Sequence, residues 1–154
     1  VLFRGDVREN IAYRAPYVED DVIIRASKLA GVDEFIKRHP AGYALQVSEN
    51  GQNLSGGQRQ SIGVARALLL DAPFLLLDEP TNTMDGTTEQ KLLKNLKQVE
   101  LNTTFLLVTH KMSLLALVDR LLVVEDGQLV ADGDKNTVLK SLQQKASSNA
   151  QKEA

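Results

Sequence analysis

Two short runs of apolar residues, each followed at once by polar ones, constrain the fold of this chain more than any other feature. The first run covers residues 74–77 and the second lies within residues 103–109. Uninterrupted apolar runs of this length are typical of strands in a parallel sheet, which are covered on both faces. The segment between them, residues 87–99, has apolar residues at helical spacing. The sequence therefore predicts a strand–helix–strand unit, a largely parallel sheet and an α/β fold.

The first half of the chain is predicted to be helical. Three segments there have apolar residues at helical spacing, namely residues 19–29, 32–38 and 55–70. Ser55 and Gln58 have the spacing of a capping box, in which each side chain bonds the backbone N–H of the other residue. Thr87 and Gln90 repeat this spacing in the second half of the chain. Both pairs predict where a helix begins.

The C-terminal part is predicted to add a hairpin and a closing helix. A short helix is expected at residues 112–118. The Asp126–Gly127 pair separates two strand-like segments, residues 121–125 and 128–131, which predicts a tight antiparallel hairpin at the edge of the sheet. A last helix is expected at residues 136–144. The low-complexity end, residues 146–154, is interpreted as a frayed, flexible tail.

Composition and charge exclude several classes of protein. The 154 residues are about one domain's worth. Eighteen Lys and Arg against twenty Asp and Glu give a net charge of −2, which argues against a general nucleic-acid binder. The chain has no cysteine, so disulfides and thiol chemistry are excluded. It has no apolar run of the ~20 residues that a membrane-spanning helix needs. Because it opens on Val-Leu-Phe, we interpret it as a fragment of a longer protein.

Polar side chains follow both predicted strands at the point where each strand ends. Asp78 and Glu79 follow the first strand, and His110 follows the second. Ligands of open parallel sheets bind at the carboxyl ends of the strands. Asp78 is the candidate ligand for Mg²⁺, which prefers oxygen. Glu79 points the other way in an extended chain and could act on a water molecule, while His110 could donate to a phosphate. Taken singly, an acid here can merely cap a turn, and a lone histidine is more often structural.

The sequence Leu54-Ser-Gly-Gly-Gln58 predicts an anion site at the start of a helix. Gly56 and Gly57 follow the predicted cap Ser55, so the backbone N–H groups there are unobstructed and carry the positive end of the helix dipole. The plainer alternative is a cap softened by glycine. Gly51 and Gly56 have the glycine spacing of a P-loop, but Gly57 and Gln58 stand where a P-loop requires Lys and then Ser or Thr. No other stretch of the sequence qualifies, so the sequence contains no P-loop.

Four motifs together resemble those of the ATP-binding-cassette (ABC) ATPases. Residues 54–60, LSGGQRQ, resemble the signature motif, and residues 74–79, FLLLDE, look like the Walker B strand with its catalytic glutamate. Residues 81–85, TNTMD, are similar to the D-loop, and Thr109–His110 to the switch histidine. The resemblance covers nearly the whole chain, and it implies a P-loop NTPase-like core that binds ATP and Mg²⁺.

The resemblance also implies how the domain is divided. Residues 1–145 would form a partial ABC ATPase domain that lacks the Walker A part. Within it, residues 5–72 would be the helical signature subdomain, and residues 73–145 would carry the Walker B strand and the switch histidine.

The roles that the resemblance implies extend to a second subunit. Nucleotide domains of this family pair head to tail, so Ser55, Gly56, Gly57 and Gln58 would contact the nucleotide held by the partner domain. Asp85 would reach across the same interface. Glu79 and His110 would be catalytic, and Asp78 would hold the metal ion.

Weaker resemblances point to a subfamily. Residues 47–51, with Glu49 and Gly51, look like the loop by which exporters contact their transmembrane domain. Met84, Lys111, residues 114–120 and residues 130–133 resemble type I secretion exporters. That resemblance implies a place on the cytoplasmic face of the inner membrane, with membrane fusion and outer-membrane proteins as further partners. Two alternatives stay open: a soluble ABC ATPase that acts on ribosomes or DNA, and a non-hydrolysing regulatory half-site.

Overall fold

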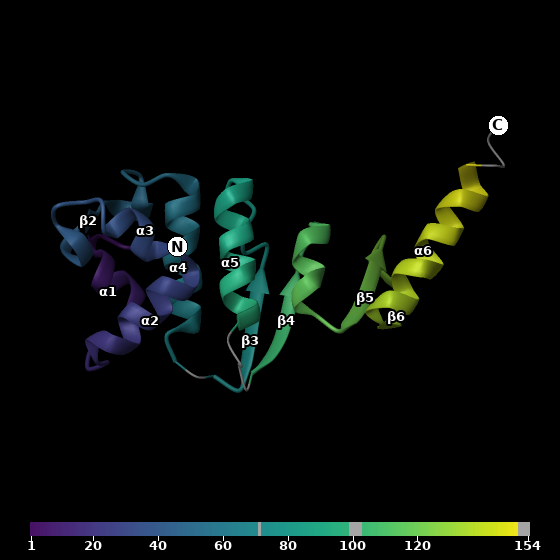
Figure 1. Cartoon of the computed structure of the whole chain (residues 1–154), viewed down its shortest axis with the longest axis horizontal. Coiled ribbons are helices and arrows are strands. Elements are labelled where there is room, and N and C mark those ends of the chain that lie inside the picture. Colours follow the sequence, from purple (N-terminus) through teal and green to yellow (C-terminus); the bar gives the residue numbers. More distant parts are fainter. Residues whose placement is uncertain (71, 99–102, 151–154) are drawn as a thin grey trace. The chain divides into compact units, whose positions relative to one another are not determined.

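The computed structural model describes residues 1–70, 72–98 and 103–150. The chain divides into two compact units, Val1–His110 and Lys111–Ala154, each of which is described by itself (Figure 1).

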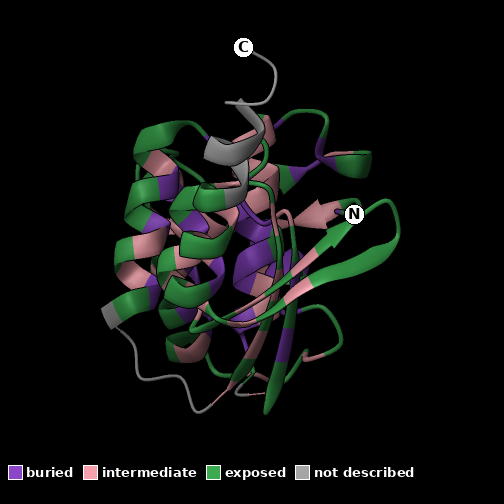
Figure 2. Ribbon diagram, turned by 90° about the vertical axis from the view of Figure 1, so that its right-hand side faces the viewer, coloured by how far each residue is buried: buried purple, intermediate pink, exposed green. Residues whose placement is uncertain are grey.

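The first unit begins with a group of helices. They are α1 (Val7–Ile11), α2 (Asp20–Ala30), α3 (Val32–Ile36) and α4 (Gly56–Leu68). Two very short strands, β1 (Gly5–Asp6) and β2 (Gln46–Val47), pair antiparallel beside them. Val7, Ile11 and Ile62 are fully buried and form the centre of this helical core, whose burial can be followed in Figure 2.

The sequence analysis missed helix α1. Its start carries a capping box, because Glu9 N donates to the Asp6 carboxylate at 2.7 Å and Asp6 N donates to the Glu9 carboxylate at 2.8 Å. The helix is joined to α4 by Arg66, which donates to Asn10 O at 2.7 Å. The Asp-x-x-Glu spacing was therefore a signal of a helix start that could have been read from the sequence.

The parallel strand–helix–strand unit is confirmed. Strands β3 (Phe74–Asp78) and β4 (Thr104–Val108) pair in parallel, with Leu76 opposite Leu106, and helix α5 (Gly86–Gln98) lies between them in the sequence. The end of the predicted helix, at residue 99, lies outside the described residues.

The prediction that β3 is covered on both faces is wrong for the described part of the chain. Leu75 and Leu77 are buried, but 54% of Phe74 and 56% of Leu76 are exposed. The physical reason is that β3 and β4 form a sheet of only two strands, and the described residues cover one face of it. Apolar side chains of β4, Leu106 and Val108, are also exposed.

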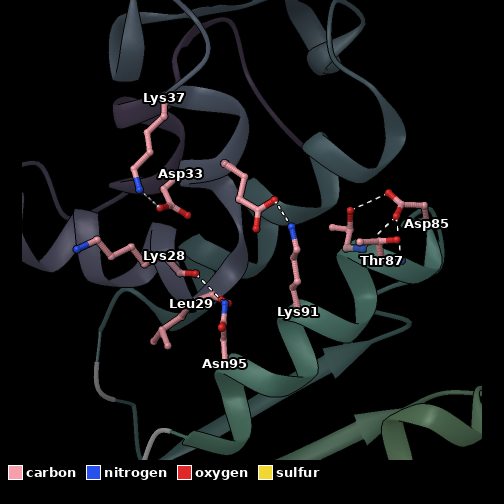
Figure 3. A network of polar contacts seen from close by, with 10 residues as sticks. Lys28, Leu29, Asp33, Lys37, Asp85, Thr87, Lys91 and Asn95 are labelled. Atoms are coloured by element: carbon pink, nitrogen blue, oxygen red, sulfur yellow. Dashed lines mark hydrogen bonds and ion pairs between the residues drawn. The ribbon is translucent and has the colours of Figure 1, made fainter.

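Side chains of α5 connect it to the helical core. Asn95 donates to the carbonyl oxygens of Lys28, at 3.0 Å, and Leu29, at 3.3 Å, at the end of α2. Lys91 forms an ion pair of 2.8 Å with Glu34 in α3 (Figure 3). These contacts fix α5 against the same helices that pack on α4.

The second unit contains the predicted hairpin. Strands β5 (Arg120–Glu125) and β6 (Gln128–Asp134) pair antiparallel across Asp126 and Gly127, both of which have positive φ, at 48° and 76°. Such a pair is typical of a type I′ turn. A 3₁₀ helix, Met112–Leu117, precedes the hairpin.

Helix α6 (Lys135–Ala150) closes the second unit and runs beyond the predicted end at residue 144. Its first side chain connects it to the preceding segment, since Lys135 Nζ donates to Leu115 O at 2.9 Å and to Val118 O at 2.6 Å. Among the helices that the structure describes, none is both long and apolar enough to cross a bilayer.

Candidate functional site

Glu79 and His110 meet at the ends of β3 and β4, as their positions in the sequence predict. The His110 Nδ1–H donates to Glu79 Oε1 at 2.7 Å, and the His110 backbone N–H donates to the same oxygen at 3.2 Å. With Nδ1 engaged in this way, the His110 Nε2 is left for another contact. The His110 side chain is 70% exposed, whereas that of Glu79 is only 29% exposed. The His110 imidazole is therefore accessible, and the Glu79 carboxylate is largely covered.

The second oxygen of Glu79 is the most unusual atom of this pair. Glu79 Oε2 is buried and has no hydrogen-bond partner among the described residues. An unpaired carboxylate oxygen away from solvent is costly, and a catalytic role and a bound water molecule are among the explanations for such an atom. The arrangement leaves Oε2 as the oxygen that can accept a proton or orient a water molecule, since Oε1 is held by His110.

Asp78 lies one residue before Glu79, and its side chain is exposed at the end of β3. No group of three or more acidic or histidine side chains that could hold a metal gathers in residues 1–70, 72–98 and 103–150. One exposed carboxylate nevertheless fits Mg²⁺, which commonly binds through one or two carboxylates together with water and substrate phosphates. The donor set is therefore compatible with the predicted magnesium ligand.

The start of α4 has the predicted capping box. Gln58 N donates to Ser55 Oγ at 3.2 Å, and Ser55 N donates to Gln58 Oε1 at 2.9 Å. Both polar side chains are thus paired with each other's backbone. The N–H groups of Gly56 and Gly57, in the first helical turn, have no acceptor within the helix itself. What this helix start presents to an anion is its backbone N–H groups, its dipole, and the hydrogens of the Ser55 hydroxyl and the Gln58 amide, which the capping box does not use.

Gly56 is required by a neighbour inside the chain as well as by any ligand. A Cβ atom at this position would lie 2.9 Å from the Cβ of Thr83, in the turn that follows β3. Gly57 is less restricted, because its Cβ would meet Thr83 O at an ordinary 3.5 Å. The prediction that both glycines leave space for a ligand is therefore incomplete. Gly56 also allows the turn that contains Thr83 to approach the start of α4.

Glu49 begins a short 3₁₀ helix, Glu49–Gly51, in a loop that several side chains bind by hydrogen bonds. Asn53 accepts from Ser48 N at 2.8 Å and donates to Gln46 O at 2.7 Å. Arg59 in α4 donates to Gly51 O at 3.2 Å and Leu54 O at 2.6 Å. The side chain of Glu49 itself is exposed. The sequence analysis did not assign Arg59 and Asn53 to this loop.

Asp85 caps α5 in this structure. One carboxylate oxygen accepts from the N–H groups of Thr87 and Thr88, both at 3.0 Å, and the other accepts from Thr88 Oγ1 at 2.7 Å (Figure 3). The predicted cap at Thr87 is wrong, because Asp85 takes that role two residues earlier. The Thr88 hydroxyl and then the Thr88 backbone N–H lower the pKa of Asp85.

We expect the contribution of Asp85 to stability to depend on pH. A carboxyl group whose pKa is lower in the folded state stabilises the fold above its ordinary pKa, and this contribution is lost as pH falls through the lowered value. Urea unfolding at neutral and acid pH should show that Asp85→Ala destabilises the protein at neutral pH and much less at acid pH. Asp85→Asn, which keeps an uncharged cap, is the control and should remove only the part of the pH dependence that Asp85 contributes. A cost of Asp85→Ala that is the same at both pH values would contradict this expectation.

Gln60 is a residue of this region that the sequence analysis did not single out. Its side chain connects α4 to the turn after β3: it donates to Glu79 O at 2.6 Å and accepts from Thr83 N at 2.7 Å. The sequence contained no signal for it beyond its place two residues after Gln58.

Comparison with known proteins shows the family to which the chain belongs. The sequence model of the family described as ABC transporter matches residues 2–82, more than half of the chain. The chain therefore belongs to the ABC transporter family.

The relatives are named as flippases and exporters. The chain is 42% identical to the ATP-dependent lipid A-core flippase of Legionella pneumophila (strain Paris) and 39% identical to ATP-dependent lipid A-core flippase 1 of Colwellia psychrerythraea, in each case over 90% of the chain. It spans only 24% and 23% of these relatives. A structure of a bacterial Atm1-family ABC exporter with ATP bound matches with a TM-score of 0.85 and 35% identity. That match covers 92% of this chain and 25% of the exporter.

Proposed function

We propose that this chain supplies the signature motif, the Walker B carboxylates and the switch histidine of an ABC exporter, whose intact form hydrolyses ATP to drive export. The observation that carries the proposal is the Glu79 carboxylate, with one oxygen held by His110 and the other buried without a partner. Family membership and the similarity to an exporter with ATP bound support it. They also favour it over a soluble ABC ATPase or a regulatory half-site.

Each residue of the site has a part in this proposal. Glu79 Oε2 orients the attacking water and accepts its proton, and His110 fixes the other oxygen through Nδ1–H. A contact from His110 Nε2 to a phosphate oxygen, which only accepts, requires that both ring nitrogens of His110 carry hydrogen. Asp78 would hold Mg²⁺, which, when bound, neutralises charge on the phosphates. Because the sequence contains no P-loop, the main phosphate cradle comes from outside these 154 residues.

A second nucleotide domain completes the site. The N–H groups of Gly56 and Gly57 and the caps Ser55 and Gln58 form a helix start suited to phosphate, and this start would close over the nucleotide of the partner domain. Asp85 would face the same partner while it caps α5. The exposed Glu49, on its loop, would contact the transmembrane domain on the cytoplasmic side of the inner membrane.

For the cargo we propose a lipid in the first place. The relatives named above are lipid A-core flippases, and lipid A-core is the cargo that their name describes. Type I protein secretion, predicted from Met84, Lys111, residues 114–120 and residues 130–133, is the second candidate. Membrane fusion and outer-membrane partners belong to that candidate alone.

Reconstitution of the intact protein in lipid vesicles tests the function. MgATP should drive the movement of a labelled lipid A-core between the leaflets, with ATP hydrolysis stimulated by that lipid. Transport of a secreted polypeptide, without lipid movement, would instead support the second candidate. Hydrolysis that neither cargo stimulates, with no movement of either, would contradict the proposed export role.

We expect Glu49 to couple hydrolysis to transport. Glu49→Gln should lower lipid movement several-fold more than basal ATPase activity, because the exposed side chain faces the membrane domain rather than the nucleotide. The same substitution at Glu125, an exposed glutamate of β5, is the matched control and should change neither quantity. Equal losses of transport and basal hydrolysis in Glu49→Gln vesicles would assign Glu49 to the nucleotide site.

A further inference from the structure

The Gln60 side chain connects α4 directly to the backbone of Glu79. Its amide nitrogen donates to Glu79 O at 2.6 Å. Its amide oxygen accepts from Thr83 N at 2.7 Å and from Thr83 Oγ1 at 2.8 Å. A single half-buried side chain therefore clamps both ends of the turn that follows β3.

The backbone that this clamp holds is strained. Glu79 has a φ of 44°, in the left-handed region that residues with a Cβ atom rarely adopt. Such a conformation persists only where the surroundings impose it. On one side of the residue, Glu79 N donates to Val108 O at 2.9 Å, which continues the pairing of β3 with β4. On the other side, the carbonyl is held by Gln60 and, at 3.2 Å, by Asn82 N.

The direction of the Glu79 carboxylate follows from this conformation. A change of φ at Glu79 rotates its Cα–Cβ bond, and the bond to His110 Nδ1 and the buried position of Oε2 depend on where that bond points. Gln60 does not touch the carboxylate. It acts on the peptide that carries the carboxylate.

We propose that Gln60 is a positioning residue that holds Glu79 in the left-handed conformation required for hydrolysis. This inference rests on the proposed function, in which Glu79 is the general base. The inference adds a connection between two sites. Helix α4, whose start is proposed to face the partner's nucleotide, is joined through the Gln60 amide to Glu79, the proposed general base of this chain's own site. An amide side chain of this length offers a donor for Glu79 O and an acceptor for Thr83 N on two neighbouring atoms of the same group.

Two substitutions separate positioning from general support of the fold. Gln60→Glu keeps the length of the side chain and the acceptor for Thr83, but it places a carboxylate oxygen against Glu79 O where a donor is needed. Gln60→Met keeps the length and removes both interactions. Gln90→Met, at an exposed glutamine of α5, is the matched control.

The experiment is steady-state ATP hydrolysis by the intact transporter. Both Gln60 variants should lose roughly 10- to 100-fold in kcat with an unchanged KM for ATP, because a misplaced catalytic group costs rate rather than binding. Gln90→Met should keep the wild-type kcat. In a Glu79→Gln background, Gln60→Glu should cause no further loss of the residual rate, since the group that it positions is already absent.

Three results would overturn the inference. Wild-type kcat in either Gln60 variant would show that the amide is not needed. Equal losses from Gln60→Glu in the wild-type and Glu79→Gln backgrounds would assign Gln60 a structural role. Full ATP hydrolysis by Glu79→Gln would overturn the proposed function, and this inference with it. If Glu79→Gln loses ATP hydrolysis but Gln60→Glu keeps it in full, this inference alone is overturned. A variant that fails to fold is recognised by its thermal unfolding, and the second Gln60 variant then carries the test.

Discussion

Glu79→Gln is expected to lower ATP hydrolysis by the intact protein roughly 10²–10⁴-fold, the contribution of a positioned general base. Gln has the shape of Glu, so it preserves the packing at the end of β3, but its amide cannot accept the proton of an attacking water. Binding of MgATP should be unchanged. Because ATP then persists, the paired nucleotide domains should accumulate in the closed, ATP-bound state, which gel filtration detects as a stable dimer.

Asp78→Asn, at the residue next to Glu79, is expected to have a different effect from Glu79→Gln. Loss of a negatively charged ligand should weaken the Mg²⁺-dependent affinity for ATP, and no trapped dimer should form. The two variants therefore differ in both affinity and oligomeric state, although their substitutions remove the same charge. A trapped dimer from Asp78→Asn, and none from Glu79→Gln, would reverse the two assignments.

Ser55→Asp is expected to abolish ATP-driven dimerisation while it leaves ATP binding by the separate domains intact. Asp is as good a helix cap as Ser, so the start of α4 should persist. Its negative charge, however, would lie beside the N–H groups of Gly56 and Gly57, where the phosphate of the partner's nucleotide is proposed to bind. Light scattering with and without MgATP measures the effect.

Ser55→Asn is the matched control for this charge. Asn has the shape of Asp and also caps helices well, but it is neutral, so dimerisation should be retained to a large extent. If both variants dimerise as fully as the wild-type protein, no phosphate binds at this helix start. Equal loss in both would mean that the size of the side chain, and not its charge, is what the interface rejects.

The parts of the fold that were predicted correctly are those whose signals are local. Apolar runs and helical spacing identified β3, β4 and α5, and Ser55 with Gln58 marked the start of α4. The hairpin followed from Asp126–Gly127 because two residues with positive φ determine such a turn. In each case, the residues that determine the structure are neighbours in the sequence.

The features that were missed depend on contacts between distant residues. The covering of β3 depends on what packs against each face, and an apolar run alone does not reveal whether the cover comes from these 154 residues. The 2.6 Å bond from Gln60 to Glu79 O joins residues 19 positions apart. The positive φ of Glu79 likewise has no local signal, since the surroundings impose it. Glu79 and His110 were placed correctly because the parallel topology alone brings their strand ends together.

The paired side chains at the start of α4 have a consequence for chemical selectivity. Ser55 Oγ and Gln58 Oε1 accept hydrogen bonds from each other's backbone, so what remains at this helix start is a dipole and a set of donors, namely peptide N–H groups, the Ser55 hydroxyl hydrogen and the Gln58 amide hydrogens. Such a surface distinguishes negative charge and its geometry, and it is blind to the purine or pyrimidine ring attached to the phosphates. In the proposed function, this helix start therefore contributes no preference for ATP over GTP or CTP. Any preference of the intact protein for adenine therefore has to arise where the ring itself is touched.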